Sequence, residues 1–111
     1  MAGISTHILN ASLGQPAPNV LVKLFQNTAH ESVLLDQQLT DVDGRIQAFK
    51  IESFIEGKYQ LVFEVSDYFE ALNIESFYSS VCIDFKVADV QQHYHVPLLI
   101  SPFSYSTYRG S

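Results

Sequence analysis

The chain has 111 residues, which is enough for one hydrophobic core and too few for two domains, so we expect a single domain over residues 1–111. Hydrophobic residues make up 47% of the sequence and charged residues 16%, a balance typical of a globular chain and not of a disordered one. Twelve acidic residues against six basic ones give a formal charge of −6, which repels nucleic acid phosphates and anionic membrane surfaces, so neither is an expected partner.

The cysteine content and the first residues indicate a soluble, cytoplasmic protein. Cys82 is the only cysteine, so no intrachain disulfide can form and a reducing compartment is the simplest setting. Because it lies in the apolar run 81–83 with no basic neighbour, we expect Cys82 to be a small buried hydrophobe and not a nucleophile. The sequence shows neither a secretion signal nor a stretch near the ~20 apolar residues of a membrane span.

Period-2 alternation of apolar and polar residues predicts about eight strands. In chain order they are Ser5–Asn10, Asn19–Gln26, Val33–Thr40, Arg45–Ala48, Lys58–Val65, Val81–Val87, His93–Ile100 and Tyr105–Arg109. Turn residues such as those of Asp43-Gly44 separate them. The alternation is clearest in Lys58–Val65, where four apolar side chains share one face.

One segment breaks the alternation and predicts a two-turn helix. Residues 66–73 begin with the cap-type Ser66 and Asp67, end at Asn73, and carry Phe69 and Leu72 three positions apart. Many short strands with a single small helix favour an all-β fold, a β-sandwich of two sheets.

The strand His93–Ile100 has two different faces. Its even positions, from Tyr94 to Ile100, are apolar and suited to a sandwich core, which leaves His93, His95 and their odd-numbered neighbours on the opposite face. A face that combines histidines with Pro and Leu is typical neither of a core nor of a solvated surface. We therefore predict a partly covered surface there, such as a subunit interface or a pocket.

Three imidazoles could also form a metal site. His7 on the first strand joins His93 and His95, and neutral imidazole is a common ligand of zinc and copper. No Cys, Asp or Glu is placed as an obvious fourth ligand, so we favour a site without a metal. His30, in the loop 27–32, has no partner suggested by the sequence, and a solvated loop histidine is the favoured interpretation.

Arg45 follows the turn Asp43-Gly44 and has two interpretations. It is either a surface charge or a ligand-binding group, because a guanidinium fork suits a planar, oxygen-rich, anionic ligand better than a lysine does. The last strand is crowded with aromatic and hydroxyl residues, a composition that fits an edge or interface strand.

The ending Tyr108-Arg109-Gly110-Ser111, preceded by His93–Leu99 and Ser101-Pro102, resembles the C-terminal signature of the transthyretin-related proteins that act as 5-hydroxyisourate hydrolases. Further segments fit the same family, namely the opening Ile4–Asn10, the turn Pro16–Val20, Asp43-Gly44-Arg45 and Tyr68-Phe69. The resemblance thus spans nearly the whole chain.

The resemblance implies a transthyretin-like sandwich that dimerises through edge strands and pairs again into a homotetramer, with sites in a central channel. It implies that His7, Arg45 and His95 are catalytic, and that the substrate is bound by Tyr108, Arg109, Gly110 and Ser111. The implied reaction is the hydrolysis of 5-hydroxyisourate to 2-oxo-4-hydroxy-4-carboxy-5-ureidoimidazoline in urate breakdown. No metal or organic cofactor is implied.

The residue types suit that reaction. Attack of water on a ring carbonyl releases a proton, and a histidine that titrates near neutral pH can take it and return it to the leaving ring nitrogen. Either His7 or His95 is the expected base, and the other orients the water or stabilises the oxyanion. Arg45 and Arg109 are expected to hold the anionic substrate, and Gly110 to let the backbone pass closely.

Two other functional classes stay open. Transthyretins proper are similar in fold to this family and carry hormones in the same channel, so a small-molecule carrier is the alternative. The resemblance weighs against it, because carriers have no counterparts of His7, Arg45, His95 and the terminal Tyr108–Ser111. A plain interaction module is the second alternative, and it would leave the histidine face unexplained.

Overall fold

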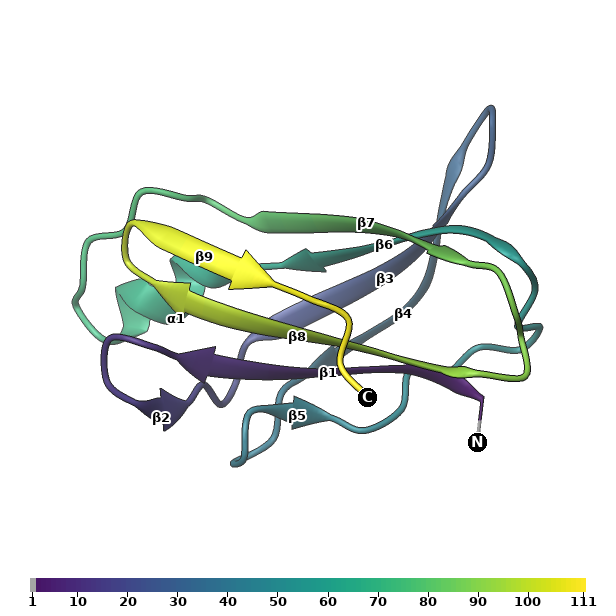
Figure 1. Cartoon of the computed structure of the whole chain (residues 1–111). Helices are drawn as coiled ribbons and strands as arrows, with labels where there is room; N and C mark the ends of the chain where they lie inside the picture. Colours follow the sequence, from purple (N-terminus) through teal and green to yellow (C-terminus); the bar gives the residue numbers. More distant parts are fainter. Residues whose placement is uncertain (1) are drawn as a thin grey trace.

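Two β-sheets packed face to face form the body of the molecule, with a short helix at one end (Figure 1). The computed structural model describes residues 2–111. The strands are β1 (Gly3–Asn10), β2 (Gln15–Pro16), β3 (Leu21–Asn27), β4 (Ser32–Leu39), β5 (Arg45–Ile46), β6 (Gly57–Phe63), β7 (Val81–Val87), β8 (His93–Ser101) and β9 (Ser104–Thr107), and the helix is α1 (Val65–Ala71). The predicted all-β sandwich with one short helix is confirmed.

The first and the last strand, β1 and β9, belong to the same sheet. Its strand order is β2-β1-β8-β9, with β5 also pairing with β1, and the second sheet has the order β4-β3-β6-β7. All pairings are antiparallel except that of β1 with β8, which run parallel although most of the chain separates them. After β9 the last residues run back along β8 towards β1 (Figure 1).

Residues 2–111 contain nine strands, one more than the alternation predicts. The additional strand β2 has two residues, one of them a proline, so it is too short to show any alternation. β5 ends at Ile46 instead of Ala48, and β9 is Ser104–Thr107 instead of Tyr105–Arg109. The long strands agree with the prediction to within a few residues at each end.

The helix begins earlier than its cap-type residues suggest. α1 starts at Val65 after Glu64, which makes no side-chain capping hydrogen bond, so Ser66 lies inside the first turn. Asn73 lies just beyond the C-terminal end with a φ of 59°, a left-handed conformation that asparagine tolerates, and the predicted stop there is sound. Among residues 2–111 no helix has the length and apolar composition needed to cross a membrane.

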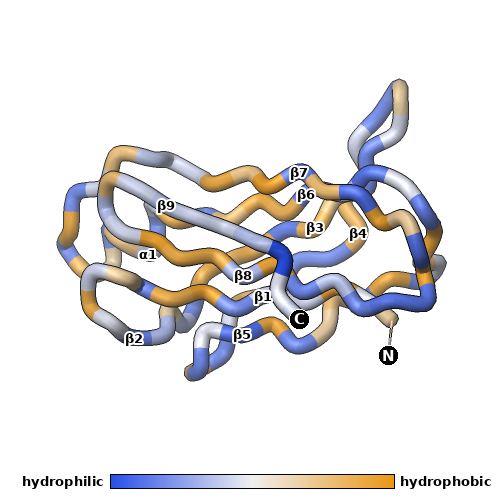
Figure 2. Tube along the Cα trace, viewed as in Figure 1, coloured by the Kyte–Doolittle hydropathy of each residue, from blue (hydrophilic) through white to orange (hydrophobic). Residues whose placement is uncertain are grey.

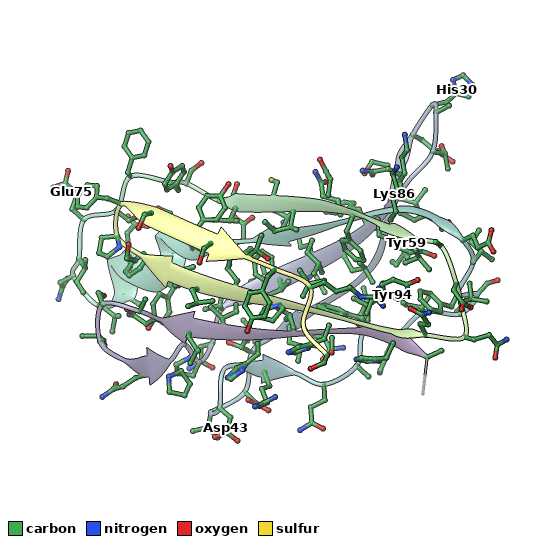
Figure 3. The ribbon with its side chains drawn as sticks, viewed as in Figure 1. His30, Asp43, Tyr59, Glu75, Lys86 and Tyr94 are labelled. Atoms are coloured by element: carbon green, nitrogen blue, oxygen red, sulfur yellow. The ribbon has the colours of Figure 1, made fainter. Side chains whose placement is uncertain are left out.

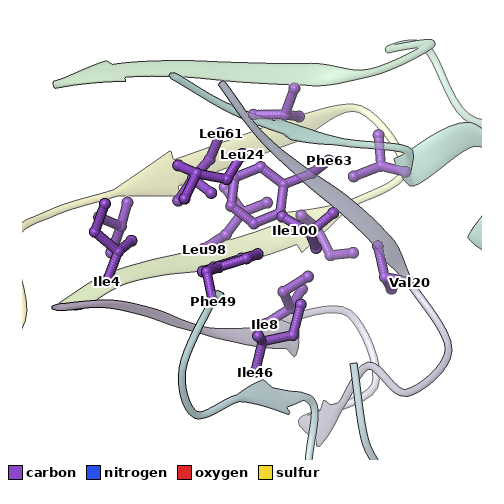
Figure 4. Close-up of a cluster of buried hydrophobic side chains, with 14 of the residues drawn as sticks. Ile4, Ile8, Val20, Leu24, Ile46, Phe49, Leu61, Phe63, Leu98 and Ile100 are labelled. Atoms are coloured by element: carbon purple, nitrogen blue, oxygen red, sulfur yellow. The ribbon is translucent and has the colours of Figure 1, made fainter. Parts of the chain in front are cut away.

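The core lies between the two sheets (Figure 4). Ile4 and Ile8 of β1 and Leu98 and Ile100 of β8 face the side chains of β3 and β6 there, and all four are at most 1% exposed. The predicted core faces are therefore confirmed for β8 and, through the buried Leu61, for β6. Removing each such side chain from water contributes roughly 1.5–3 kcal/mol, which fixes which face of β1 and β8 turns outward.

The prediction for Cys82 is wrong, because the thiol is exposed. β7 is the edge strand of the second sheet, with Val81 and Val87 buried, so the pleat turns the intervening Cys82 to the outer face. An apolar neighbourhood in the sequence therefore did not mean a buried position. Figure 2 shows hydrophobic residues concentrated along the strands and hydrophilic ones in the loop that leads into β8.

Candidate active site

A hollow of about 400 Å³ lies on the outer face of the first sheet. It is lined by Ser5, Thr6, Arg45, Ile46, Gln47, His93, His95 and Ser111. These residues come from β1, β5, β8 and the end of the chain, which are far apart in the sequence. A hollow of this size, lined by a few converging polar groups, is typical of a small-molecule site.

The parallel register of β1 and β8 builds the floor of the hollow. Ser5 lies beside His95, and His7 lies beside Pro97, so His7 and His95 are diagonal neighbours on the outer face. Both histidines and His93 are half-buried. The prediction that the face of His93 and His95 is partly covered is confirmed, because both rings line the hollow.

Arg45 stands at the rim because a tight turn holds its backbone. The Asp41 carboxylate accepts hydrogen bonds from the backbone N–H groups of Asp43 and Arg45, each at 2.9 Å. Gly44 has a φ of 75° and lies so close to β1 that a Cβ would come within 2.5 Å of the Ile8 carbonyl oxygen, so only glycine fits. The turn leads Arg45 into β5, where it pairs directly with His7.

Two residues that shape the hollow are not among the predicted site residues: Asp41 holds the turn before Arg45, and Ser5 lines the hollow. Asp41 precedes the Asp-Gly turn by two positions, and an aspartate that accepts bonds from following N–H groups is a common turn signal. Ser5 has no such signal. Its Oγ lies 2.7 Å from Nε2 of His93 and 2.7 Å from Nδ1 of His95, and these contacts depend on the register of strands almost 90 residues apart.

The pKa of His95 is lowered below the ordinary histidine value of 6.5. Burial in the hollow is the largest cause, followed by the positive charge of Arg45 and then by the charged forms of His7 and His93. The imidazole therefore stays neutral to lower pH than a free histidine does. A neutral ring at neutral pH can accept a proton, which is what a general base requires.

The tail passes directly over His95. The backbone N–H of Gly110 donates to the His95 carbonyl oxygen at 2.8 Å, and a Cβ at Gly110 would lie 2.6 Å from Cδ2 of the ring. The predicted close passage of the backbone at Gly110 is confirmed. It brings Ser111 to the wall of the hollow.

Tyr108 and Arg109 are not brought to this hollow within one chain. Gly110 lies opposite His95, so the preceding Arg109 turns to the other side of the sheet, where its Cζ lies 4.4 Å from the ring centroid of Tyr94. Its Nη2 donates to Gln92 Oε1 at 2.9 Å. Tyr108 and Arg109 line a second hollow with Phe85 of β7 and Tyr94, which Figure 3 labels.

The histidines and carboxylates of residues 2–111 do not form a cluster suited to a metal ion. In this part of the chain no group of three His, Cys, Asp or Glu side chains converges on a common point. The residues gathered in the hollow are instead two imidazoles, a hydroxyl bridge and a guanidinium. Groups of these types can transfer protons and bind anions.

Known proteins resemble the chain over its full length. A family model described as "HIUase/Transthyretin family" matches residues 4–110. The 5-hydroxyisourate hydrolase of Caulobacter vibrioides is 41% identical over 115 residues that cover all of both chains. The structure of Klebsiella pneumoniae 5-hydroxyisourate hydrolase matches with a TM-score of 0.89 and 37% identity over all of both chains. Sea bream transthyretin in complex with thyroxine matches with a TM-score of 0.91 and 30% identity, over 96% of this chain and 93% of that one. The chain therefore belongs to the HIUase/Transthyretin family.

Proposed function

We propose that the chain hydrolyses 5-hydroxyisourate to 2-oxo-4-hydroxy-4-carboxy-5-ureidoimidazoline in urate breakdown. The observation that carries the proposal is the hollow itself, in which a neutral, half-buried His95 lies with Arg45 and Ser111. The full-length likeness to a hydrolase of Caulobacter vibrioides supports it, at 41% identity. The fold alone would not, because sea bream transthyretin has the same one.

His95 is the base in the proposed reaction. It accepts a proton from water as the water oxygen attacks a ring carbonyl of the substrate, and it returns that proton to the ring nitrogen as the C–N bond breaks. Its lowered pKa keeps the ring neutral at neutral pH. Its place in the hollow favours it over His7, which is beside the hollow next to Arg45. His7 then orients the attacking water or stabilises the oxyanion.

Arg45 holds the substrate in this proposal. The guanidinium presents two parallel N–H donors, which match the oxygens of a planar anion, and its positive charge opposes the charge that develops on the carbonyl oxygen. The Asp41 turn fixes the backbone from which the side chain extends. No step of the reaction requires a metal or an organic cofactor, and a cytoplasmic location remains a prediction from composition.

We infer that the complete site is shared between subunits of a homotetramer. β9 is an edge strand with every residue exposed, and such an edge offers unpaired backbone groups to a second copy of the chain. Tyr108 is 60% exposed and, within its own chain, lines the second hollow and not the one that contains His95. In the proposed assembly Tyr108 and Arg109 bind substrate in the hollow of a neighbouring subunit.

A carrier like transthyretin is the alternative, and the lining of the hollow does not favour it. A site for an apolar hormone is mostly apolar, whereas this hollow contains Arg45 and two histidines. Carriage also gives no reason for a base whose pKa is lowered. The hydrolase accounts for both features.

The direct test uses freshly generated 5-hydroxyisourate. Its absorbance decay is followed with and without the protein, against the spontaneous rate, and a His95→Ala variant is measured in parallel. We expect acceleration by the wild-type chain and a loss of most of that acceleration in the variant. A decay at the spontaneous rate with correctly folded wild-type protein would refute the proposed function.

A further inference from the structure

His93 has no task in the reaction described above, yet it is tied to the base. The Ser5 hydroxyl lies between the two rings, 2.7 Å from His93 Nε2 and 2.7 Å from His95 Nδ1. Ser5 is only 6% exposed, so water cannot readily replace either ring as its partner. The three groups form a short chain of hydrogen bonds that leads from His93 to His95.

The single proton of the hydroxyl limits how this chain can be arranged. Ser5 Oγ can donate to one ring nitrogen and accept from another, but it cannot donate to both. If His93 Nε2 accepts the Ser5 proton, His95 Nδ1 must carry a proton of its own and donate to Oγ. If His95 Nδ1 accepts instead, the proton on that ring must be at Nε2.

The two arrangements differ in what His95 can do. Nδ1 is bound to Ser5, so Nε2 is the ring nitrogen left to the hollow. With Nδ1 protonated, Nε2 has a free lone pair and can take a proton from water. With Nε2 protonated, the neutral ring cannot act as a base there.

The charge in the hollow favours the first arrangement. Arg45 lines the same hollow as His95, and a positive charge favours a lone pair facing it over an N–H group. The first arrangement also needs no rearrangement once His95 Nε2 has taken up a proton. The Nδ1–H bond to Ser5 persists, and the bond from Ser5 to His93 polarises the hydroxyl so that it stabilises the imidazolium.

We propose that His93 is a positioning residue, which accepts the Ser5 proton at Nε2 and thereby keeps His95 in the tautomer whose Nε2 is free to act as the base. The proposal deepens the proposed hydrolase function and rests on it for the kinetic effect. The task resembles that of a group that orients a catalytic histidine from behind, with a hydroxyl and a neutral ring in place of a carboxylate.

The test compares His93→Phe with His93→Gln. Phenylalanine has no hydrogen-bond acceptor, so the Ser5 hydroxyl donates to His95 Nδ1 instead. The ring proton of His95 then lies at Nε2, and this nitrogen can no longer act as the base. We expect kcat to fall about 10- to 100-fold with KM nearly unchanged, since general acid–base help is typically worth ~10²–10⁴ and part of the ring population still reaches the active form. Glutamine reaches a similar distance and its amide oxygen can accept the Ser5 proton, so His93→Gln should keep kcat close to wild type.

His30→Phe is the matched control for losing a histidine. His30 lies at the tip of the hairpin between β3 and β4, exposed and remote from the hollow (Figure 3). This variant should leave kcat and KM unchanged. Ser5→Ala removes the bridge itself and should lower kcat as His93→Phe does, which keeps the test informative if the phenylalanine variant does not fold.

An NMR measurement without substrate reads the tautomer independently of activity. Imidazole ¹⁵N shifts are recorded well above pH 6.5, where His95 is neutral. We expect Nδ1–H on His95 in the wild type and in His93→Gln, and Nε2–H in His93→Phe. An Nε2–H tautomer in the wild type, or an unchanged kcat in folded His93→Phe, would overturn the proposal. Wild-type protein that shows the Nδ1–H tautomer but does not hydrolyse 5-hydroxyisourate would instead refute the proposed function and leave the hydrogen-bond assignment standing.

Discussion

Gly110 lies against the imidazole of His95, so closely that a Cβ on the glycine would be 2.6 Å from Cδ2 of the ring and 3.1 Å from Cγ of Pro97. Real Cβ atoms do not approach other atoms so closely, and His95 cannot simply swing away because Ser5 holds its Nδ1. A single methyl group at position 110 must therefore displace either the tail or the base.

We expect Gly110→Ala to lower kcat strongly and to change the thermal midpoint little, since an error of 1 Å in the position of a catalytic group can cost about 10² in rate. Gly14→Ala is the matched control. Nothing lies within 4 Å of a Cβ there, but the φ of 67° makes alanine unfavourable by about 1–2 kcal/mol. Gly14→Ala should lose stability and keep its kcat. If Gly110→Ala kept its kcat and lost stability instead, the tail would not hold His95 in its catalytic position.

Removing either histidine should abolish most of the activity while leaving the fold intact. His7 and His95 are on the outer face of the sheet and contribute little to the core, so His7→Ala and His95→Ala should retain the wild-type circular dichroism. Each should lose about 10²–10⁴ in kcat, and His95→Ala the more of the two. A folded variant with wild-type kcat would remove that histidine from the mechanism.

The pH dependence of kcat/KM should report the lowered pKa of His95. The base must be neutral, so activity should fall as pH decreases through a pKa that lies below 6.5 in the free protein. Arg45 contributes to that lowering, so Arg45→Gln should move the acid limb to higher pH. Arg45→Lys keeps the charge and should leave the limb in place, while kcat/KM falls because an ammonium lacks the planar fork.

The free energy of unfolding should also depend on the protonation of His95. Because the pKa of His95 is lower in the folded chain, the unfolded chain binds its proton first as pH falls below 6.5. The free energy of unfolding should therefore decrease in the window between 6.5 and the folded pKa, and His95→Gln should remove this part of the decrease. An NMR titration of His95 checks both statements, and a folded pKa at or above 6.5 would disprove them.

The parts of the fold that follow from local pattern could be predicted from the sequence. The two faces of β8 differ in composition, so the alternation alone predicts Tyr94 in the core and His95 on the outer face, as the structure has them. β2 was missed because two residues cannot display a period. Cys82 was misplaced because its apolar neighbours suggested burial, although the pleat of an edge strand decides the face.

The contacts inside the site could not be predicted, because they depend on long-range register. Ser5 meets His93 and His95 only through the parallel pairing of β1 with β8, which local alternation does not determine. The family resemblance supplied the residues Tyr108 and Arg109 but not their direction. The bridge of Gly110 to His95 sets that direction and turns Arg109 over Tyr94.

Prolonged treatment with a strong chelator should leave the activity unchanged. The proposed steps use imidazoles, a guanidinium and water, and none of them needs a Lewis acid. The measurement is the rate of 5-hydroxyisourate decay before and after chelation and after addition of zinc or copper. Activity that is lost on chelation and recovered with metal would replace the metal-free mechanism by one in which the histidines bind a metal.

Mixed assemblies should reveal whether Tyr108 acts in the hollow of a neighbouring subunit. Tyr108 lines a separate hollow from His95 in its own chain, so a shared site needs the tyrosine of one subunit and the histidines of another. His95→Ala and Tyr108→Ala should each be nearly inactive alone. Refolded together, they should regain part of the activity, because some sites then combine an intact hollow with an intact tyrosine.

The matched control mixes His95→Ala with His7→Ala. Both changes affect the same hollow of the same chain, so every mixed site lacks one of the two histidines and no activity should return. Light scattering must show tetramers in both mixtures for the comparison to count. A tetramer that regains nothing in the first mixture would show that each hollow works with the tyrosine of its own chain. A Tyr108→Ala variant that is fully active by itself would show that Tyr108 is not part of the site.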